Sequence, residues 1–124
     1  MIQNARHFTI DRLIAELKRC ESAANVWFDF CQHHPTGFAD SYRGYYEDLA
    51  LGWKRDYEPP TVAFLLGTLL DLIGKTITGY KGGEYVVSGR TALWVANRGE
   101  TGSTAVVGVT NHGYRVTINT EEME

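Results

Sequence analysis

The chain has 124 residues, of which 44% are hydrophobic and 22% are charged. This length and composition are typical of one globular domain, and they exclude a disordered chain, a collagen-like repeat and a coiled coil. Its 12 basic and 15 acidic residues give a formal net charge of −3, so it lacks the broad basic surface that holds duplex nucleic acid. A domain of this length buries about two thirds of its unfolded surface, enough for a core without disulfide or metal staples.

Cysteine content and apolar stretches indicate where the protein resides. There are two cysteines, Cys20 and Cys31, and no charged-then-apolar secretion signal opens the chain, so we expect free thiols in a reducing cytoplasm. The longest apolar stretch, Val62 to Ile73, is well short of the roughly 20 residues that a membrane span needs. The sequence therefore predicts a soluble protein with no membrane partner.

The first half of the chain predicts one helix and two strands. Thr9 is a good N-cap, and the apolar residues after it have helical spacing, so a helix is expected over about residues 9–23. These apolar residues are Ile10, Leu13, Ile14 and Leu17. Val26 to Phe30 and Tyr45 to Leu51 predict strands, and the segment from His33 to Gly37 between them predicts a loop.

A second helix is predicted over about residues 61–73. Pro59 and Pro60 stop the preceding strand, Thr61 is an N-cap, and Gly74 follows the end of the helix. Apolar side chains surround nearly its whole circumference, more than one small sheet would cover. Two interpretations follow: the helix is buried within its own domain, or it also packs against a second subunit.

From residue 76 to residue 119 the pattern changes to short β segments separated by glycine. The predicted strands are Glu84 to Val87, Thr91 to Ala96, Thr104 to Val109 and Tyr114 to Asn119, with turns near Gly89, at 99–102 and at 111–113. Residues 121–124 are expected to be frayed. The sequence thus predicts an α+β fold in a single domain, residues 1–124, with two main helices packed on a mostly antiparallel sheet.

Two stretches resemble known functional motifs but lack residues that those motifs require. Gly74-Lys75-Thr76 matches the end of a phosphate-binding P-loop, but Leu69 stands where the motif needs its first glycine, and a helix rather than a strand precedes it. Cys31, His33 and His34 carry metal-ligand atoms, yet a structural zinc site needs a second ligand pair. We therefore expect neither an NTPase nor a metal site.

The sequence offers no positive argument for an enzyme. It contains no nucleophile elbow, and its acidic residues fall mostly on exposed helix faces or at the tail. Asp40 and Asp48 are interpreted as ion-pair partners of Arg43, and His7 and His112 as ordinary surface or core histidines. We expect no catalytic residue and no cofactor.

Two segments do indicate ligand binding. The first, the arginine–tyrosine segment, is Ser41-Tyr42-Arg43-Gly44-Tyr45-Tyr46; Arg43 can hold a phosphate through two hydrogen bonds while the ring of Tyr45 stacks on a base. The second, the lysine–glycine segment, is Thr78-Gly79-Tyr80-Lys81-Gly82-Gly83-Glu84-Tyr85, whose turn amides bind anions beside the charge of Lys81. The candidate residues here are Arg43, Tyr45, Gly79, Tyr80, Lys81, Gly82 and Gly83. The alternative is that both are ordinary hairpin turns.

The late strands add further candidates, in which cations stand beside hydrogen-bonding groups. They are Arg90, Trp94, Asn97, Asn111 and Arg115. Strand alternation places Arg90 and Trp94 on one side with small alanines, which leaves room for a flat ligand. Ordinary surface charge at strand ends is the alternative.

The order of the two segments, with a leading amphipathic helix and a helix between them, resembles the Thoeris anti-defence proteins of the first type, a bacteriophage family. The resemblance covers roughly residues 9–96. It implies a non-enzymatic sponge in the host bacterial cytoplasm that sequesters cyclic ADP-ribose isomers and, in some members, cyclic di- or trinucleotides. It also implies dimers that join into hexamers with ligands enclosed between subunits, Arg43 and Lys81 contacting phosphate, and Gly79, Gly82 and Gly83 supplying backbone.

Three other functions compete with this hypothesis. An interaction protein would bind and inhibit a host defence protein through its aromatic Arg43 region. A single-stranded nucleic-acid binder would stack bases on tyrosines. The excess of acidic over basic residues argues against this function. A signal-degrading phosphodiesterase needs a base or metal that the sequence does not indicate.

Overall fold

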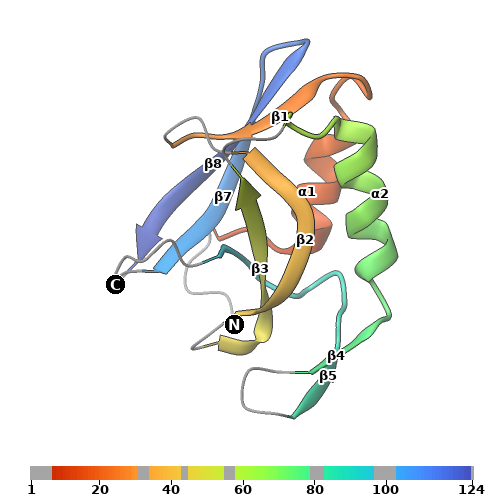
Figure 1. The fold of residues 1–124 in the computed structure, drawn as a ribbon, viewed down its shortest axis with the longest axis vertical. Helices are drawn as coiled ribbons and strands as arrows, with labels where there is room; N and C mark the ends of the chain where they lie inside the picture. The colour runs from red at the N-terminus through yellow and green to blue at the C-terminus, as the bar shows by residue number, and fades with distance from the viewer. Residues whose placement is uncertain are drawn as a thin grey trace.

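Two helices lie against one side of a curled β-sheet (Figure 1). The computed structural model describes residues 7–30, 34–42, 45–54, 58–78, 83–96 and 103–123. The helices are α1 (Ile10–Leu17) and α2 (Val62–Leu72). The strands are β1 (Asn25–Phe28), β2 (His34–Tyr42), β3 (Tyr45–Lys54), β4 (Thr76–Thr78), β5 (Glu84–Val86), β6 (Leu93–Val95), β7 (Ser103–Asn111) and β8 (Arg115–Met123).

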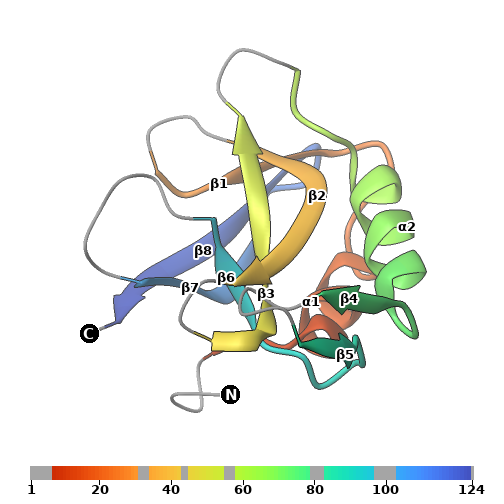
Figure 2. The same cartoon turned by 60° about the horizontal axis from the view of Figure 1, so that its bottom comes forward.

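The main sheet has six strands in the order β1-β8-β7-β6-β3-β2, and β4 and β5 form a separate antiparallel ladder. Within the main sheet, β2–β3, β6–β7 and β7–β8 are antiparallel, whereas β1–β8 and β3–β6 are parallel. The sheet curls until its two edge strands, β1 and β2, are in contact (Figure 2). The predicted small domain with two helices on a mostly antiparallel sheet is confirmed, and the two parallel pairings are additions to it.

Helix α2 begins as the sequence predicts. Thr61 is its N-cap, and the Thr61 hydroxyl oxygen accepts a hydrogen bond from the Phe64 amide over 3.1 Å. The chain turns away after the helix through Gly74, whose φ of +92° lies in the region that glycine favours.

Helix α1 is shorter than predicted, because it ends at Leu17 rather than near residue 23. Its four apolar positions are buried as expected, but the next two residues, Lys18 and Arg19, are exposed, and Cys20, which follows in helical register, is half-buried. Thr9 occupies the N-cap position without a side-chain capping bond. A helix persists where it buries apolar surface, and this one stops where that burial stops.

The main core fills the space between the helices and the sheet. Fully buried leucines of both helices meet buried β-branched residues from the sheet, among them Leu13, Leu17, Leu65, Leu69, Val26, Val116 and Ile118. A smaller cluster lies apart from this core, made of Ala50, Trp94, Ala105 and Val107.

Several local predictions are wrong. The predicted loop from His33 to Gly37 is largely strand, because β2 begins at His34 and includes Pro35. Proline is tolerated there because β2 is an edge strand, and its register with β3 shifts between Pro35 and Ala39. Residues 121–123, expected to be frayed, pair with 103–105 in the β7–β8 ladder.

The other predicted strands are present with shifted ends, and β4 was not predicted. The turn expected at 99–102 lies outside the described residues. Cys20 is a free thiol, as expected, whereas Cys31 also lies outside them.

Candidate functional site

Described residues at the flanks of the two segments singled out in the sequence come together in the fold. The Tyr85 hydroxyl, at the end of the lysine–glycine segment, donates a hydrogen bond to the backbone oxygen of Asp48 over 3.0 Å. Asp48 follows the arginine–tyrosine segment by two residues, and β2 and β4 are also in contact. The start of β3 and the β4–β5 ladder accordingly lie at the same end of the molecule (Figure 1). We call this end, defined by Tyr42, Tyr45, Thr78, Gly83 and Tyr85, the motif end.

Several candidate residues cannot be placed within it. Arg43, Gly79, Tyr80, Lys81, Gly82 and Asn97 lie outside the described residues. Tyr45 is the first residue of β3, and Gly83 is exposed immediately before β5, with open space where a Cβ would stand. The described flanks of the two segments therefore lie near one another, at the motif end.

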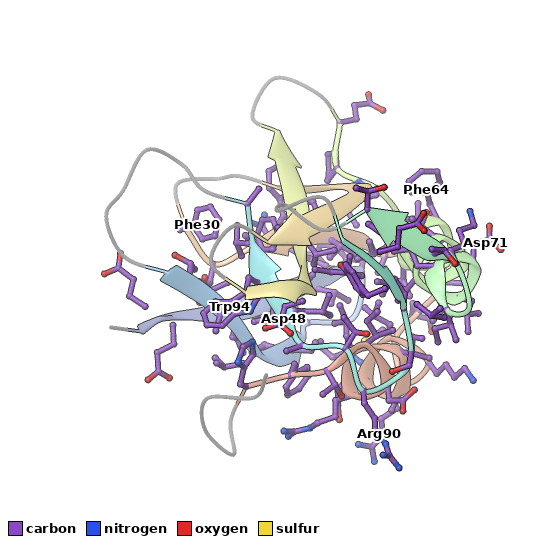
Figure 3. All side chains as sticks on the ribbon, turned by 90° about the horizontal axis from the view of Figure 1, so that it is seen from below. Phe30, Asp48, Phe64, Asp71, Arg90 and Trp94 are labelled. Carbon is purple, nitrogen blue, oxygen red and sulfur yellow. The ribbon has the colours of Figure 1, made fainter. Side chains whose placement is uncertain are left out.

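A buried polar contact lies directly behind the motif end. The Trp94 indole Nε1 donates a hydrogen bond to the Oδ2 atom of Asp48 over 2.8 Å. Trp94 is 0% exposed and Asp48 is 2% exposed, and the two side chains lie together in the interior in Figure 3. A charged carboxylate is tolerated at this depth because it is hydrogen-bonded.

This contact corrects one sequence-based prediction and bears on a second. Trp94 was expected to offer a flat face to a ligand, but a fully buried ring has no face open to solvent. Asp48 is buried and accepts the Trp94 N–H, and its expected ion pair with Arg43 stays a prediction, because Arg43 lies outside the described residues. Both residues hold the sheet together behind the motif end.

His7 completes the buried polar group. Its Nε2 is 2.8 Å from the backbone oxygen of Leu93, so Nε2 carries the proton and donates it. The ring meets Trp94 edge-to-face, with centroids 4.4 Å apart. Burial lowers the pKa of His7, and the Leu93 carbonyl and the charge of Asp48 oppose that shift. Nδ1 is buried and has no hydrogen-bond partner among the described residues.

The late-strand candidates do not join the motif end. Asn111 and Arg115 stand at the β7–β8 turn, at the opposite end of the molecule's longest dimension from β4 and β5 (Figure 1). There, Asn111 Oδ1 accepts a hydrogen bond from the Gly113 amide over 2.8 Å, and the Arg115 guanidinium lies 4.8 Å from the centre of the Trp27 ring. These contacts are those of an Asx turn and a surface cation–π pair.

Arg90 is also apart from the other candidates. It is exposed in the turn before β6, beside the first turn of α1, where the Gly89 carbonyl accepts a hydrogen bond from the Asp11 amide over 2.9 Å. Figure 3 shows its side chain projecting into solvent at the α1 side. The structure therefore does not bring Arg90, Asn111 and Arg115 into one pocket.

Sequence reasoning missed Asp48, Tyr85 and His7 as a connected group. One signal was present: the N–H of a tryptophan in a buried strand needs an acceptor. Nothing in the sequence indicated that this acceptor stands 46 positions earlier in the chain.

Comparisons with protein-family models, with curated proteins and with solved structures find no match to this chain. Neither described helix has the length and apolarity that crossing a bilayer requires. No group of three or more metal-ligating side chains occurs in the part of the chain that the structure describes. The functional argument therefore proceeds from the geometry of the motif end and from the sequence.

Proposed function

We propose that this protein binds a cyclic nucleotide signal at the motif end and holds it without cleaving it. In this proposal it is a bacteriophage sponge that removes an immune signal, a cyclic ADP-ribose isomer or a cyclic di- or trinucleotide, from the host bacterial cytoplasm. The single observation that carries the proposal is the 3.0 Å bond from the Tyr85 hydroxyl to the Asp48 backbone, because it links the end of the lysine–glycine segment to the strand that continues from the arginine–tyrosine segment.

The chemistry of the two segments is complementary. A cyclic nucleotide of this kind carries at least two negative charges and one or two flat bases. Arg43 supplies a guanidinium for a phosphate, Lys81 adds a second charge, and the glycine amides between Thr78 and Tyr85 supply further donors. Tyrosine rings of the first segment supply stacking faces. Each segment alone is incomplete, and their meeting at one end supplies both sets of groups.

Binding without cleavage is consistent with the roles of the two buried titratable residues behind the site. Asp48 is hydrogen-bonded to Trp94, and the Nε2 of His7 to Leu93. Both side chains are at least 98% withdrawn from solvent, so a ligand arriving from solution does not reach them. Their positions suit a structural role, whereas a general base must lie within hydrogen-bond reach of the reacting group.

Tight retention favours a site enclosed between subunits. Nanomolar affinity requires about 12 kcal/mol, more than one open groove of this polarity is expected to supply once the cost of immobilising the ligand is counted. The proposal therefore includes a homo-oligomer, a dimer that joins into a hexamer, in which a second subunit covers the ligand.

Calorimetry and native mass spectrometry against a panel of cyclic nucleotides test the proposal. The bound ligand is released by denaturing the protein, and chromatography compares it with the starting compound; we expect it intact. Arg43→Ala and Lys81→Ala should each weaken binding about tenfold or more, because each removes a charge-assisted hydrogen bond. Arg19→Ala, at an exposed arginine of the α1 end, is the control and should bind as the wild type does.

Three results would contradict the proposal. A cleaved ligand would place the protein among the enzymes. Unchanged affinity in both Arg43→Ala and Lys81→Ala would remove the site. No binding, with no ligand-dependent rise in melting temperature, would favour the alternative, an interaction protein that inhibits a host defence protein.

A further inference from the structure

The chain segment that leads into α1 belongs to the main sheet. We call residues 7–9 the entry segment, which runs antiparallel to the chain at the start of β6. The Phe8 carbonyl accepts a hydrogen bond from the Leu93 amide of β6 over 3.1 Å, and the Phe8 amide donates to the Val106 carbonyl of β7 over 2.7 Å. The entry segment therefore connects β6 with β7.

The other pairings of β6 and β7 do not involve the entry segment. β6 pairs with β3, and the Ala96 amide that follows β6 donates to the Leu51 carbonyl of β3 over 2.8 Å. β7 pairs with β8 along its length, and with β6 at Trp94. The entry segment can therefore detach while these ladders persist, and such a local opening requires less free energy than global unfolding.

The side chain of His7 adds a further bond between the entry segment and β6. Its Nε2 donates to the Leu93 carbonyl over 2.8 Å, so the entry segment binds both backbone polar groups of Leu93. The ring is 1% exposed, and its Nδ1 has no hydrogen-bond partner among the described residues. This environment suits a neutral ring with one N–H, because a second N–H on Nδ1 would be buried without a described acceptor.

The charged groups around His7 determine how its ring responds to acid. Burial has the largest effect and lowers the pKa of His7; its backbone hydrogen bond and the charge of Asp48 raise that pKa, and the charge of the amino terminus lowers it. The described residues of β6 and β7 include no titratable side chain. From α1, the Arg12 guanidinium lies 4.4 Å from the centre of the Phe8 ring and keeps its charge in mild acid. Glu121, on β8, stands on the far side of β7.

We propose that His7 is an acid-sensitive latch that controls whether the entry segment is attached to the sheet. While its ring is neutral, His7 holds the entry segment beside β6 and β7. When a proton from solvent binds Nδ1, the charged ring moves into water and the entry segment detaches, while the β3–β6 and β7–β8 ladders persist. This device goes beyond the proposed nucleotide binding, and its test contains no nucleotide, so each can fail separately.

The direction of the response follows from the state in which His7 binds the proton more tightly. In the detached segment the ring is solvated and has the ordinary pKa of 6.5, whereas in the attached segment its pKa is lower. Acid therefore favours detachment, and the effect begins as the pH falls below about 6.5. Between pH 7 and pH 5.5 the equilibrium constant for detachment should rise severalfold, by up to about eightfold.

Amide hydrogen exchange resolved by NMR measures detachment, because the Phe8 and Leu93 amides donate the bonds that break. Their protection, corrected for the intrinsic effect of pH on exchange, should fall severalfold between pH 7 and pH 5.5. The Ala96 amide, which donates to β3, is the matched control and should be better protected at both pH values. Low urea concentrations should reduce protection at Ala96 but not at Phe8 and Leu93, because local opening exposes little surface. If all three amides share one protection factor and one urea dependence, the entry segment opens only by global unfolding and the proposal is overturned.

Two variants and one measurement on the wild type assign the response to His7. His7→Gln keeps a donor for the Leu93 carbonyl but does not titrate, so protection at Phe8 and Leu93 should be equal at the two pH values. His112→Gln, at the exposed histidine of the β7–β8 turn, should respond to pH as the wild type does. NMR of the ring nitrogens follows protonation of His7 without any substitution and should show a neutral ring at pH 7. The proposal is overturned by a His7→Gln variant with the full wild-type response, or by a wild-type ring that titrates while protection at Phe8 and Leu93 stays constant.

Discussion

Trp94 and Asp48 form a hydrogen-bonded pair inside the sheet, with 2.8 Å between the indole Nε1 and the carboxylate Oδ2. Trp94 belongs to β6 and Asp48 to β3, adjacent parallel strands. The backbone oxygen of the same Asp48 accepts the hydrogen bond of Tyr85 from β5. One residue therefore connects the main sheet, through its side chain, with the small β4–β5 ladder, through its backbone.

Asp48→Ala should destabilise the protein. The substitution leaves the Trp94 N–H buried without its acceptor, which costs about 1–3 kcal/mol of unfolding free energy. Asp48→Asn keeps an oxygen that can accept the same hydrogen bond and should cost less. Chemical denaturation measures both, with Glu122→Ala, at an exposed carboxylate of β8, as the control. Equal stability of Asp48→Ala and the control would show that the bond contributes nothing.

Tyr85→Phe should weaken nucleotide binding more than it weakens folding. It removes the hydroxyl that holds β5 to Asp48 and retains the ring, so the expected loss of stability is about 0.5–1.5 kcal/mol. The flanks of the two segments then lose a bond that joins them, so the proposed function predicts that the affinity for a cyclic nucleotide falls severalfold.

Calorimetry on Tyr85→Phe and on Tyr114→Phe separates the two effects, because Tyr114 is 85% exposed and far from the motif end. An affinity that is unchanged in Tyr85→Phe would mean that the bond between the segments plays no part in binding.

The parts of the fold that were predicted correctly depend on local signals. Helix α2 follows a proline pair, starts at a capping threonine and ends before a glycine at positive φ. Each of these signals acts within a few residues, so the sequence alone locates the helix. The apolar spacing of α1 likewise identifies its buried face, although the point where that burial ends depends on the sheet.

The parts that were missed depend on partners distant in sequence. Pro35 and Gly37 are local signals for a loop, but pairing with β3 makes this segment an edge strand. Trp94 stands in an alternating pattern that suits a one-sided strand, yet residues 91–95 are all buried because both faces of β6 are covered. The elements that cover β6, the helices among them, come from other parts of the chain, and single-strand periodicity contains no information about them.

The candidate site also combines features that local residue types predict with features that depend on contacts distant in sequence. Residue types in the two segments indicate phosphate and base binding, and that inference needed no structure. Their meeting required the Tyr85–Asp48 bond, which spans 37 positions. By contrast, Arg90 is exposed on one turn and Asn111 and Arg115 are exposed on another, and residue type alone could not separate them from a binding site.

Thr61→Ala should destabilise α2 by about 1 kcal/mol, the usual contribution of a threonine or serine N-cap. The lost interaction is the 3.1 Å hydrogen bond that the Thr61 hydroxyl oxygen accepts from the Phe64 amide. Thr61→Ser keeps that oxygen and is the control. Urea denaturation should show a lower midpoint for the alanine variant alone, and equal midpoints for the two variants would show that the cap does not stabilise the helix.

Acid should destabilise the protein through His7. Burial lowers its pKa in the folded chain below the value of 6.5 expected when it is unfolded, so the unfolded chain binds the proton more readily. The stability associated with neutral His7 is therefore complete above about pH 6.5 and declines as the pH falls below it. Protonation would also place a positive charge on a ring that is 1% exposed.

His7→Gln tests this assignment, because the glutamine amide can still donate to the Leu93 carbonyl but does not titrate. Denaturation midpoints measured from neutral to mildly acidic pH should fall in the wild type and fall less steeply in His7→Gln. His112→Gln, at an exposed histidine on the β7–β8 turn, should retain the wild-type slope. If His7→Gln instead follows the wild type throughout, the acid sensitivity belongs to another group and the buried histidine is not its source.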